Sequence, residues 1–284
     1  MIDRFRSMTE VIALGAESSM RGARGGNERA AAALFARYPK VRPPLPESIA
    51  RIYAAHYKEN REGRSLASAA SQKVESWLHR QVASDVPPGT PPKSTLELGS
   101  GTLNQLAYEP ENPAYDIVEP FRHLYENSAL LGRIRHAYVD IREVPTGLVY
   151  DRITSVATLE HICDLPEVIA RSALLLEADG VFRAAIPSEG TAVWTLGWKL
   201  TTGLEFRWRH RLDYGLLMQH EHVNKAREIE DVLRFFFSRI RVKFLGLSRS
   251  VSLYQFFECR GPIQQRAHEV IAHFGGQSPS KPGG

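Results

Sequence analysis

The chain has 284 residues, enough for one large domain or for a domain with a modest appendage. Apolar residues make up 43% and charged residues 24%, a balance that excludes wholesale disorder and a coiled coil. The 36 basic and 32 acidic residues leave a formal charge of +4, which permits an anionic partner without requiring one. Cys163 and Cys259 lie too far apart for a zinc spacing or a disulfide framework. No apolar run approaches the roughly 20 residues of a membrane span, and we expect a cytoplasmic protein.

The N-terminal part is expected to be a flexible arm followed by a helical cap. Residues 1–44 include a stretch rich in Gly, Ala, Ser and Arg with weak apolar periodicity, which is typical of flexible segments. Between residues 45 and 92, apolar residues at helical spacing predict helices near 46–56 and 65–82. The prolines of residues 87–92 then end this helical part.

Strand and helix patterns alternate over residues 93–260, which predicts an α/β domain with a mainly parallel sheet. The expected elements are strands near 95–98, 115–118, 134–141, 151–157 and 181–186 and helices near 121–131, 166–176 and 228–237. Two last strands, 239–245 and 252–259, are too close in sequence to enclose a crossover helix, so we expect an antiparallel hairpin. Residues 261–284 are expected to form a C-terminal tail.

A strand that runs into a tight glycine turn is the strongest local feature. Gly99, Ser100 and Gly101 form this turn, which brings bare backbone close to a ligand. A lone Gly-x-Gly is also common in generic turns. Asn104 stands where a dinucleotide motif has its third glycine, and the carboxylate of Glu97 would repel a phosphate. A ligand with a positive amino group is therefore favoured over a nicotinamide dinucleotide.

Acidic residues follow the next two predicted strands. Glu119, with Pro120 after it, can accept hydrogen bonds from ribose hydroxyls. Asp140 can meet an adenine amino group while Ile141 packs on the ring. Each acid alone is equally typical of a helix cap or a turn. Their coincidence with the glycine turn at three strand ends favours a nucleoside site, because open α/β sheets bind ligands at that edge.

These residues resemble the motifs of the class I S-adenosylmethionine-dependent methyltransferase superfamily, of the methyltransferase type 11 kind. Residues 97–102 resemble its motif I, Glu119 falls at its ribose-binding acid, and Asp140 with Ile141 falls at its adenine site. The resemblance implies S-adenosylmethionine as the cofactor.

Two later segments extend the resemblance. Residues 151–161 resemble the fourth motif, whose Leu-Glu-His turn lies beside the methionine part of the cofactor, and this implies Ala157 and Leu159 as cofactor contacts. Residues 174–181 resemble the turn into the fifth strand. The fold class implied is a Rossmann-like, seven-stranded α/β sheet of five parallel strands and an antiparallel terminal hairpin, here with a helical N-terminal cap.

The chain departs from the family pattern after motif I. Leu103 stands where the family often has a third glycine, and a leucine there is expected to narrow the space near the methionine part of the cofactor. Pro110 and Pro113 confine the following helix to an unusually short segment.

A long insertion at about 188–227 is expected to bind the substrate, because loops of this length in compact domains usually serve function. Its aromatic and polar side chains suit a ring-bearing polar molecule. Seven of them are candidate substrate-binding residues: Glu189, Trp194, Trp198, Arg207, Arg209, Arg211 and Tyr214. The arginines can grip a phosphate or a carboxylate, and a solvated basic strand is the equal alternative.

Three histidines are the candidate catalytic residues. His161 ends the fourth motif, and a structural role at the helix start is as typical of it as general-base catalysis. His220 and His222 are the others. Their spacing suggests a metal, but no third ligand can be identified by spacing, so we favour hydrogen-bonding or packing roles and predict no metal.

The sequence therefore predicts a methyltransferase acting on a small or glycan-like polar acceptor. The turn at 186–190 and its Trp-rich continuation resemble bacterial homologues associated with surface-polysaccharide biosynthesis. One alternative is RNA methylation, with Arg207 to Arg211 binding the RNA, although nucleic acid is the less favoured partner. The other alternative is a non-catalytic binding module. The oligomeric state is not predicted.

Overall fold

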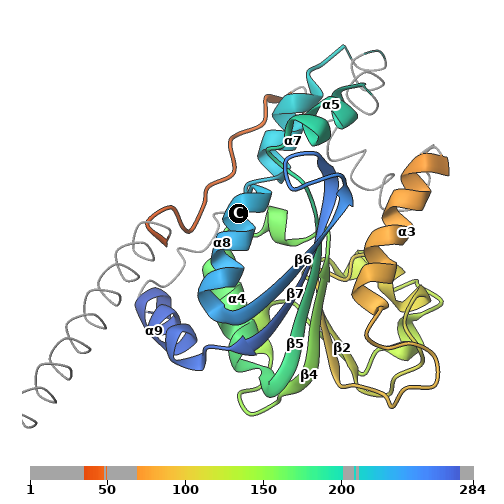
Figure 1. Ribbon diagram of the computed structural model, residues 1–284, viewed down its shortest axis with the longest axis vertical. Coiled ribbons are helices and arrows are strands. Elements are labelled where there is room, and N and C mark those ends of the chain that lie inside the picture. Colours follow the sequence, from red (N-terminus) through yellow and green to blue (C-terminus); the bar gives the residue numbers. More distant parts are fainter. Residues whose placement is uncertain (1–34, 48, 50–68, 201–207, 209–210, 276–284) are drawn as a thin grey trace, which may run out of the picture. The chain divides into compact units, whose positions relative to one another are not determined.

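The computed structural model of the chain describes residues 35–47, 49, 69–200, 208 and 211–275 (Figure 1). The chain divides into two compact units, residues 1–38 and 39–284. In the first unit, the Tyr38 amide donates a hydrogen bond to the Phe35 carbonyl. Most of the expected arm, and most of the helix expected near 46–56, lie outside the described residues.

A seven-stranded sheet with the order β3-β2-β1-β4-β5-β7-β6 forms the centre of the second unit. β1 to β5 are parallel, whereas β7 is antiparallel to both of its neighbours, β5 and β6. The expected Rossmann-like fold of five parallel strands and an antiparallel hairpin is therefore confirmed. The strands are β1 (Thr95–Leu98), β2 (Tyr115–Val118), β3 (His136–Tyr138), β4 (Tyr150–Val156), β5 (Leu176–Pro187), β6 (Phe237–Gly246) and β7 (Ser252–Pro262).

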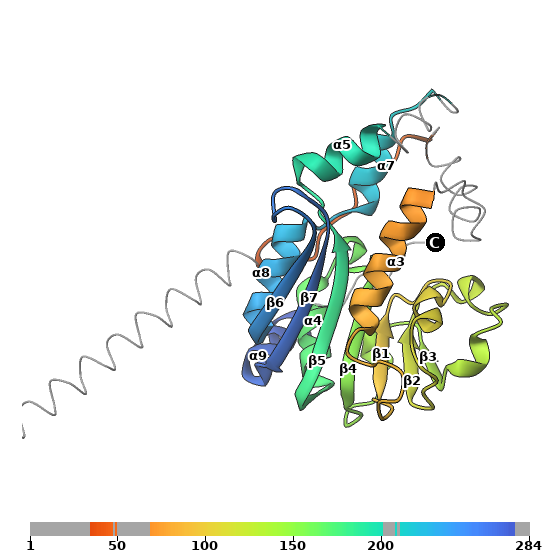
Figure 2. The same ribbon diagram turned by 45° about the vertical axis from the view of Figure 1, so that its right-hand side comes forward.

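Helices cover both faces of this sheet. α3 packs on one face against β4, β5 and β7, while α4 and α8 lie on the other face and α9 packs against these two helices (Figures 1 and 2). Every residue of β1 and β2 is buried, including Glu97 and Asp116, which accept hydrogen bonds from the hydroxyls of Tyr115 and Tyr150. The helices are α3 (Ala69–Ala83), α4 (Leu165–Leu174), α5 (Ala192–Leu200), α7 (Tyr214–Glu221), α8 (Ala226–Phe236) and α9 (Gln264–Gly275).

Two buried arginines fasten α3 to the sheet. Arg152 of β4 and Arg183 of β5 are each 1% exposed, and both donate to the Val82 carbonyl in the last turn of α3. Arg152 pairs with Glu109 at 2.7 Å, and Arg183 pairs with Asp85 at 3.1 Å. Loss of one partner of such a pair costs about 3–5 kcal/mol because it leaves a buried charge uncompensated. In its described part, the expected helical cap is thus joined to the sheet rather than set apart from it.

The segment between β2 and β3 differs from the expected helix. Two single 3₁₀ turns, η2 (Arg122–Leu124) and η3 (Leu131–Arg133), replace the helix expected near 121–131. Most side chains of residues 121–131 are exposed and only Tyr125 among them is buried, so a helix would gain little packing. The element after motif I is as short as the prolines predict, since it is the 3₁₀ turn η1 (Asn104–Ala107).

The C-terminal segment also differs from expectation, because α9 occupies half of the expected tail of residues 261–284. Ala267 and Val270 of α9 are buried, and their spacing places them on one side of the helix. Residues 276–284 lie outside the described residues. Among the helices of the described segments, none combines the length and the hydropathy that a membrane span needs.

Candidate active site

The glycine turn ends β1 at the carboxyl edge of the sheet. Gly99 has φ +68°, and a Cβ there would lie 2.3 Å from Thr158 Cγ2. Thr158, which follows β4, donates its hydroxyl to the Gly99 carbonyl at 3.3 Å. Gly101 also has a positive φ, +52°. Glycine at position 99 is thus required by both conformation and space.

Leu103, which stands where the resembled family often has a third glycine, has a left-handed backbone conformation. Its φ is +67°, which is uncommon for a residue with a side chain. The side chain is fully buried and packs with Leu106, Tyr115, Ile117 and Tyr125. Packing in this cluster holds the side chain in the core, and the left-handed backbone is the cost; the expectation that Leu103 narrows the cofactor space stays a prediction.

Glu119 lies beside the glycine turn, as predicted from its place after β2. Its Oε2 accepts from the Gly101 amide at 2.8 Å, and its Oε1 accepts from the Phe121 amide at 3.0 Å. The residue is 3% exposed. Within the described segments no Lys, Arg or His forms an ion pair with it. It is thus a buried carboxylate with spare lone pairs, while Pro120 beside it is exposed.

Asp140 and Ile141 follow β3 at the same edge. Asp140 caps the 3₁₀ turn η4 (Ile141–Glu143), accepts from the Arg142 amide at 2.8 Å, and pairs with the Arg142 guanidinium at 2.7 Å. Arg142 also pairs with Glu167 of α4 at 2.6 Å. Ile141 is buried. The structure places both residues beside the end of the third strand and gives Asp140 an additional role, anchoring Arg142.

Glu97, just before the glycine turn, and Ser100, within it, are buried polar residues whose hydrogen bonding differs. Glu97 accepts from the Tyr115 hydroxyl at 2.9 Å. Burial raises the pKa of Glu97 to about 7, against the opposing effect of that hydrogen bond. Ser100 Oγ is buried and has no hydrogen-bond partner among the described residues. The glycine turn therefore holds an unused hydroxyl, whereas the Glu97 carboxyl is already engaged by the fold.

A second group of polar residues follows β4. Ala157, with φ +49°, is exposed, and Leu159 starts the 3₁₀ turn η5 (Leu159–His161) with its side chain fully buried. Glu160 and His161 complete this turn. The family-implied contacts Ala157 and Leu159 therefore have different surroundings, and solvent reaches only the side chain of Ala157.

His161 and His222 come together although sixty residues separate them. Their ring centroids lie 4.9 Å apart in an edge-on arrangement. His161 Nδ1 faces the Glu221 carbonyl at 3.0 Å, and His222 Nδ1 faces Glu189 Oε2 at 3.0 Å. Burial lowers the pKa of His161, but the Glu221 hydrogen bond and the charges of Glu160 and Glu221 outweigh it and raise the pKa overall.

His220, the third candidate, does not join this pair. Its Nδ1 faces the Pro43 carbonyl at 2.7 Å. Because α7 ends at Glu221, His220 lies in the last turn while His222 is the residue after the helix. The two histidines thus point to different neighbours despite their close spacing.

Glu189 and Trp194 extend the histidine pair toward the hairpin. Glu189 accepts from the Trp194 indole N–H as well as facing His222. The Trp194 ring lies edge-on to Tyr254 of β7, with centroids 5.1 Å apart. Burial, followed by the charge of Glu160, raises the pKa of Tyr254. These two predicted substrate residues therefore belong to one network with the candidate catalytic pair.

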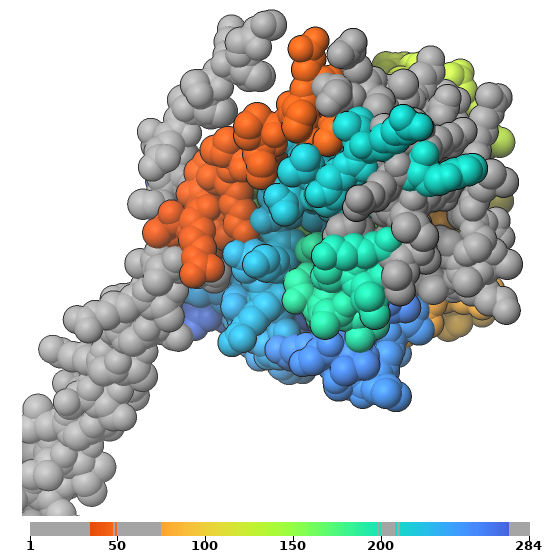
Figure 3. All heavy atoms as spheres, turned by 90° about the horizontal axis from the view of Figure 1, so that it is seen from above, coloured from red at the N-terminus to blue at the C-terminus, as the bar shows by residue number. Residues whose placement is uncertain are grey.

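Two side chains hold the network together. Asn224 is fully buried, and its Nδ2 donates to the carbonyls of Leu159 and Ile162 at 2.9 and 2.7 Å. Arg42 donates to the carbonyls of His161 and His220, both at 2.8 Å. Figure 3 shows the segment that contains Arg42 running beside the α7 segment. Both side chains therefore bridge η5 to the end of α7.

The remaining insertion residues are placed only in part. Arg207, Arg209 and the side chain of Trp198 lie outside the described residues. Arg211 is exposed with φ +57°. Tyr214 starts α7 and packs with a cluster that contains Ile49 and Leu217, and burial raises its pKa.

Sequence reasoning missed Glu160, Glu221, Asn224 and Tyr254 as members of this network. Glu160 stands next to a histidine that was itself a candidate, and this adjacency was the available signal. Asn224 acts through backbone carbonyls, and a pattern of side chains along the sequence gives no sign of such a role.

No protein-family model matches the sequence, and a comparison with curated proteins finds no significant match. Similar solved structures include the N-methyltransferase NodS from Bradyrhizobium japonicum with S-adenosyl-L-homocysteine, at 15% identity over 69% of this chain and 89% of that one, TM-score 0.47. An O-methyltransferase family protein from Burkholderia thailandensis has 15% identity over 86% and 70%, TM-score 0.48. The plantazolicin methyltransferase BpumL has 12% identity over 75% and 93%, TM-score 0.48. At these values the similarity assigns neither an activity nor a substrate to this chain.

Proposed function

We propose that the protein is an S-adenosylmethionine-dependent methyltransferase that acts on a small or glycan-like polar acceptor. The observation that carries the proposal is the buried carboxylate of Glu119 beside the glycine turn, with no cationic partner in the described segments. A buried carboxylate is costly unless hydrogen bonds satisfy it. Two ribose hydroxyls are donors of the kind that its remaining lone pairs can accept.

The residues around the turn fit the rest of such a cofactor. Ser100 offers a buried hydroxyl without a partner, and Asp140 lies at the same edge after β3. Ile141 is an apolar neighbour for a purine ring. When bound, S-adenosylmethionine supplies a methyl group activated by its sulfonium. The part of this chain is to bind the nucleoside at Glu119 and Asp140 and to orient the remainder over the glycine turn.

The histidine network supports an acceptor side at the adjoining strand ends. Val156 of β4 pairs with Ala185 of β5, so η5 and the segment after β5 leave the sheet at the same edge as the glycine turn. Trp194 and Glu189 offer an aromatic ring and a carboxylate there. Proximity and orientation are the main contribution that a protein makes to methyl transfer. We assign this network to holding the acceptor.

A glycan-like acceptor, such as one used in surface-polysaccharide biosynthesis, fits a site where aromatic and acidic groups alternate. RNA is less well matched by the described residues. Of the arginines on which the RNA alternative rests, Arg211 is exposed and, within the described part of the chain, has no carboxylate or aromatic network around it like that of Glu189 and Trp194, whereas Arg207 and Arg209 lie outside the described residues.

Calorimetry and labelled methyl transfer test the proposal together. We expect S-adenosylhomocysteine to bind at one site per chain and S-adenosylmethionine to compete with it. In a panel of sugars, nucleotide sugars, small aromatic acids and total RNA, we expect label from the methyl donor in the sugar or aromatic fractions. Absence of cofactor binding would contradict the proposal. Label in RNA, together with RNA binding that weakens strongly with salt, would show that RNA is the acceptor instead.

A further inference from the structure

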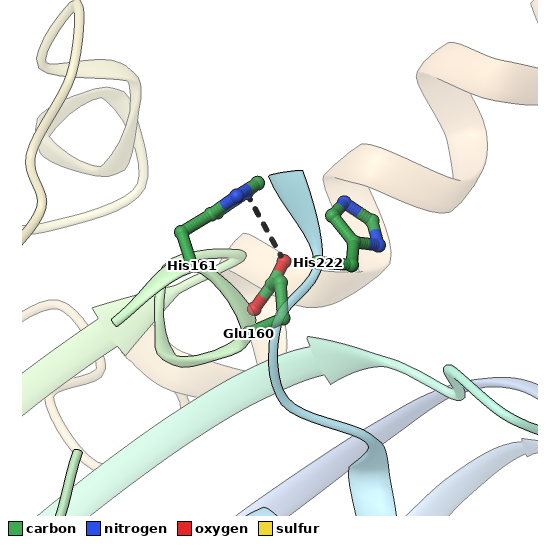
Figure 4. Close-up of side chains that lie close together, drawn as sticks. All are labelled: Glu160, His161 and His222. Atoms are coloured by element: carbon green, nitrogen blue, oxygen red, sulfur yellow. Dashed lines mark ion pairs between the residues drawn. The ribbon is translucent and has the colours of Figure 1, made fainter. Parts of the chain in front are cut away.

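We propose that Glu160, His161 and His222 form a binding site for one divalent first-row transition-metal ion. One ligand atom from each of these side chains lies within 4.8 Å of the other two. Figure 4 shows the Glu160 carboxylate between the two imidazole rings. This changes the sequence-based prediction of no metal: the ligands are not His220 and His222 with a third residue, but His222 together with Glu160 and His161 of the turn η5.

Both histidines are prepared as metal ligands by a hydrogen bond at their other nitrogen. His161 Nδ1 faces the Glu221 carbonyl, and His222 Nδ1 faces the Glu189 carboxylate, each at 3.0 Å. A carbonyl and a carboxylate only accept, so each Nδ1 carries a proton, and in the neutral imidazole each Nε2 keeps a lone pair for a metal ion. This arrangement of an imidazole between an acceptor and an ion is the usual one around bound metals.

Glu160 supplies the negative charge. The residue is 1% exposed, and its Oε2 has no hydrogen-bond partner among the described residues. Its Oε1 lies 3.8 Å from His161 Nε2, and no Lys or Arg of the described segments pairs with it. An unsatisfied buried carboxylate oxygen is costly, and a cation between it and the two rings removes that cost.

The ligands are held in place by the bridging residues around them. The Asn224 amide donates to the Glu160 carbonyl at 3.0 Å, and its side chain donates to the Leu159 carbonyl at 2.9 Å. Arg42 donates to the His161 carbonyl at 2.8 Å. The two segments that carry the ligands are thus tied together, as a preorganised site requires.

Two imidazoles and one carboxylate suit a first-row transition metal and leave coordination positions open. The inference rests on the proposed function in one respect: an open position at this edge would hold an oxygen of the methyl acceptor. An acceptor with two adjacent oxygens, such as a vicinal diol or a hydroxy acid, matches two open positions.

Cobalt binding tests the site without reference to the cofactor. The full chain, stripped with a chelator, is titrated with Co²⁺ and followed by visible absorption and by metal analysis. We expect one Co²⁺ per chain and its displacement by Zn²⁺. The variants Glu160→Gln and His222→Gln should weaken Co²⁺ binding at least about tenfold, whereas His220→Gln should leave it unchanged. Absence of stoichiometric binding, or equal affinity in all three variants, would overturn the site.

Histidine modification provides a second measurement that needs no variant. In the wild-type chain, Co²⁺ should protect His161 and His222 from diethyl pyrocarbonate and leave His220 reactive. Equal protection or equal reactivity of all three would contradict the site. S-adenosylhomocysteine calorimetry on the metal-free chain separates the two proposals, since cofactor binding without metal binding refutes only the metal site, and the reverse refutes only the proposed function.

Discussion

The two halves of the carboxyl edge are built in different ways. At the ends of β1 to β3, each candidate residue lies within a few positions of its own strand, and the parallel register brings Gly99, Glu119 and Asp140 to one edge. At the ends of β4 and β5, the network depends on His222, which follows α5 and α7 in the chain. The strand ends position the residues of the first half, whereas hydrogen bonds between distant segments position those of the second.

Because the two halves are built differently, we expect substitutions in them to have different effects. Changes in the β1–β3 half act on the sheet edge itself and should alter cofactor binding. Changes in the bridges of the other half should alter the acceptor side and leave the cofactor side intact. The following predictions test that separation, from the largest expected effect to the smallest.

Gly99→Ala should give the largest loss of stability. The added Cβ meets Thr158 at 2.3 Å, and the left-handed φ strains any side chain. We expect the free energy of unfolding to fall by about 2–4 kcal/mol, with loss of cofactor binding. Gly132→Ala is the matched control, because nothing lies within 4 Å of its Cβ position. Equal urea midpoints for the two variants would contradict the account of the turn.

Asn224→Ala should uncouple the two halves. It removes two hydrogen bonds to buried carbonyls, so we expect a loss of about 2 kcal/mol in urea denaturation. Methyl transfer should fall while S-adenosylhomocysteine affinity stays within about twofold, because Glu119 is untouched. Asn112→Ala is the control. It removes a similar pair of side-chain hydrogen bonds to the backbone before β2 and should leave methyl transfer unchanged. Parallel loss of cofactor affinity in Asn224→Ala would show that the halves are not separate.

Glu97→Gln should change how stability depends on pH. The pKa of Glu97 is about 7 in the folded chain and about 4.5 when unfolded, so the folded state binds more protons between these values. Wild-type stability should therefore fall as pH rises from about 4.5 to 7, and the variant should lose this dependence and be more stable at pH 8 by roughly 1–3 kcal/mol. Thermal melts across this range measure it, and parallel curves would contradict the assignment.

Glu119→Ala should weaken cofactor binding by about tenfold or more, because hydrogen bonds to a charged group contribute about 1.5–3 kcal/mol. Calorimetry with S-adenosylhomocysteine measures the change. Glu177→Ala, an exposed acid at the start of β5, is the control and should bind normally. If Glu119→Ala binds S-adenosylhomocysteine as tightly as the wild type, the assignment of Glu119 to the ribose is wrong. Co²⁺ affinity should be the same in the wild type and in both variants.

The sequence was sufficient to predict the seven strands and to place Gly99, Glu119 and Asp140 after the first three of them. Strands β1 and β2 have the predicted bounds because each is a short strand-forming run with proline or glycine close to both ends. The segment after β2 was misjudged because its apolar residues give no buried stripe, and α9 because Ala267 and Val270 are a weak signal among polar neighbours. The burial of Leu103 was not predicted because the residues that pack against it, such as Tyr115 and Tyr125, come from other segments of the chain.

The second half was only partly predictable. His161 and His222 were candidates by type, but nothing local indicates that His222 faces His161 whereas His220 faces Pro43. That choice is made by the end of α7 and by Asn224, which act across sixty residues. Hydrogen bonds between such distant segments leave no periodic pattern in the sequence.

A crystal structure with S-adenosylhomocysteine tests the central claim most directly, because it shows both halves at once. The account predicts the ribose at the Glu119 carboxylate, and the sulfur on the side of the glycine turn that faces His161 and His222. A ligand bound away from Glu119, or a sulfur directed away from the histidine pair, would contradict it.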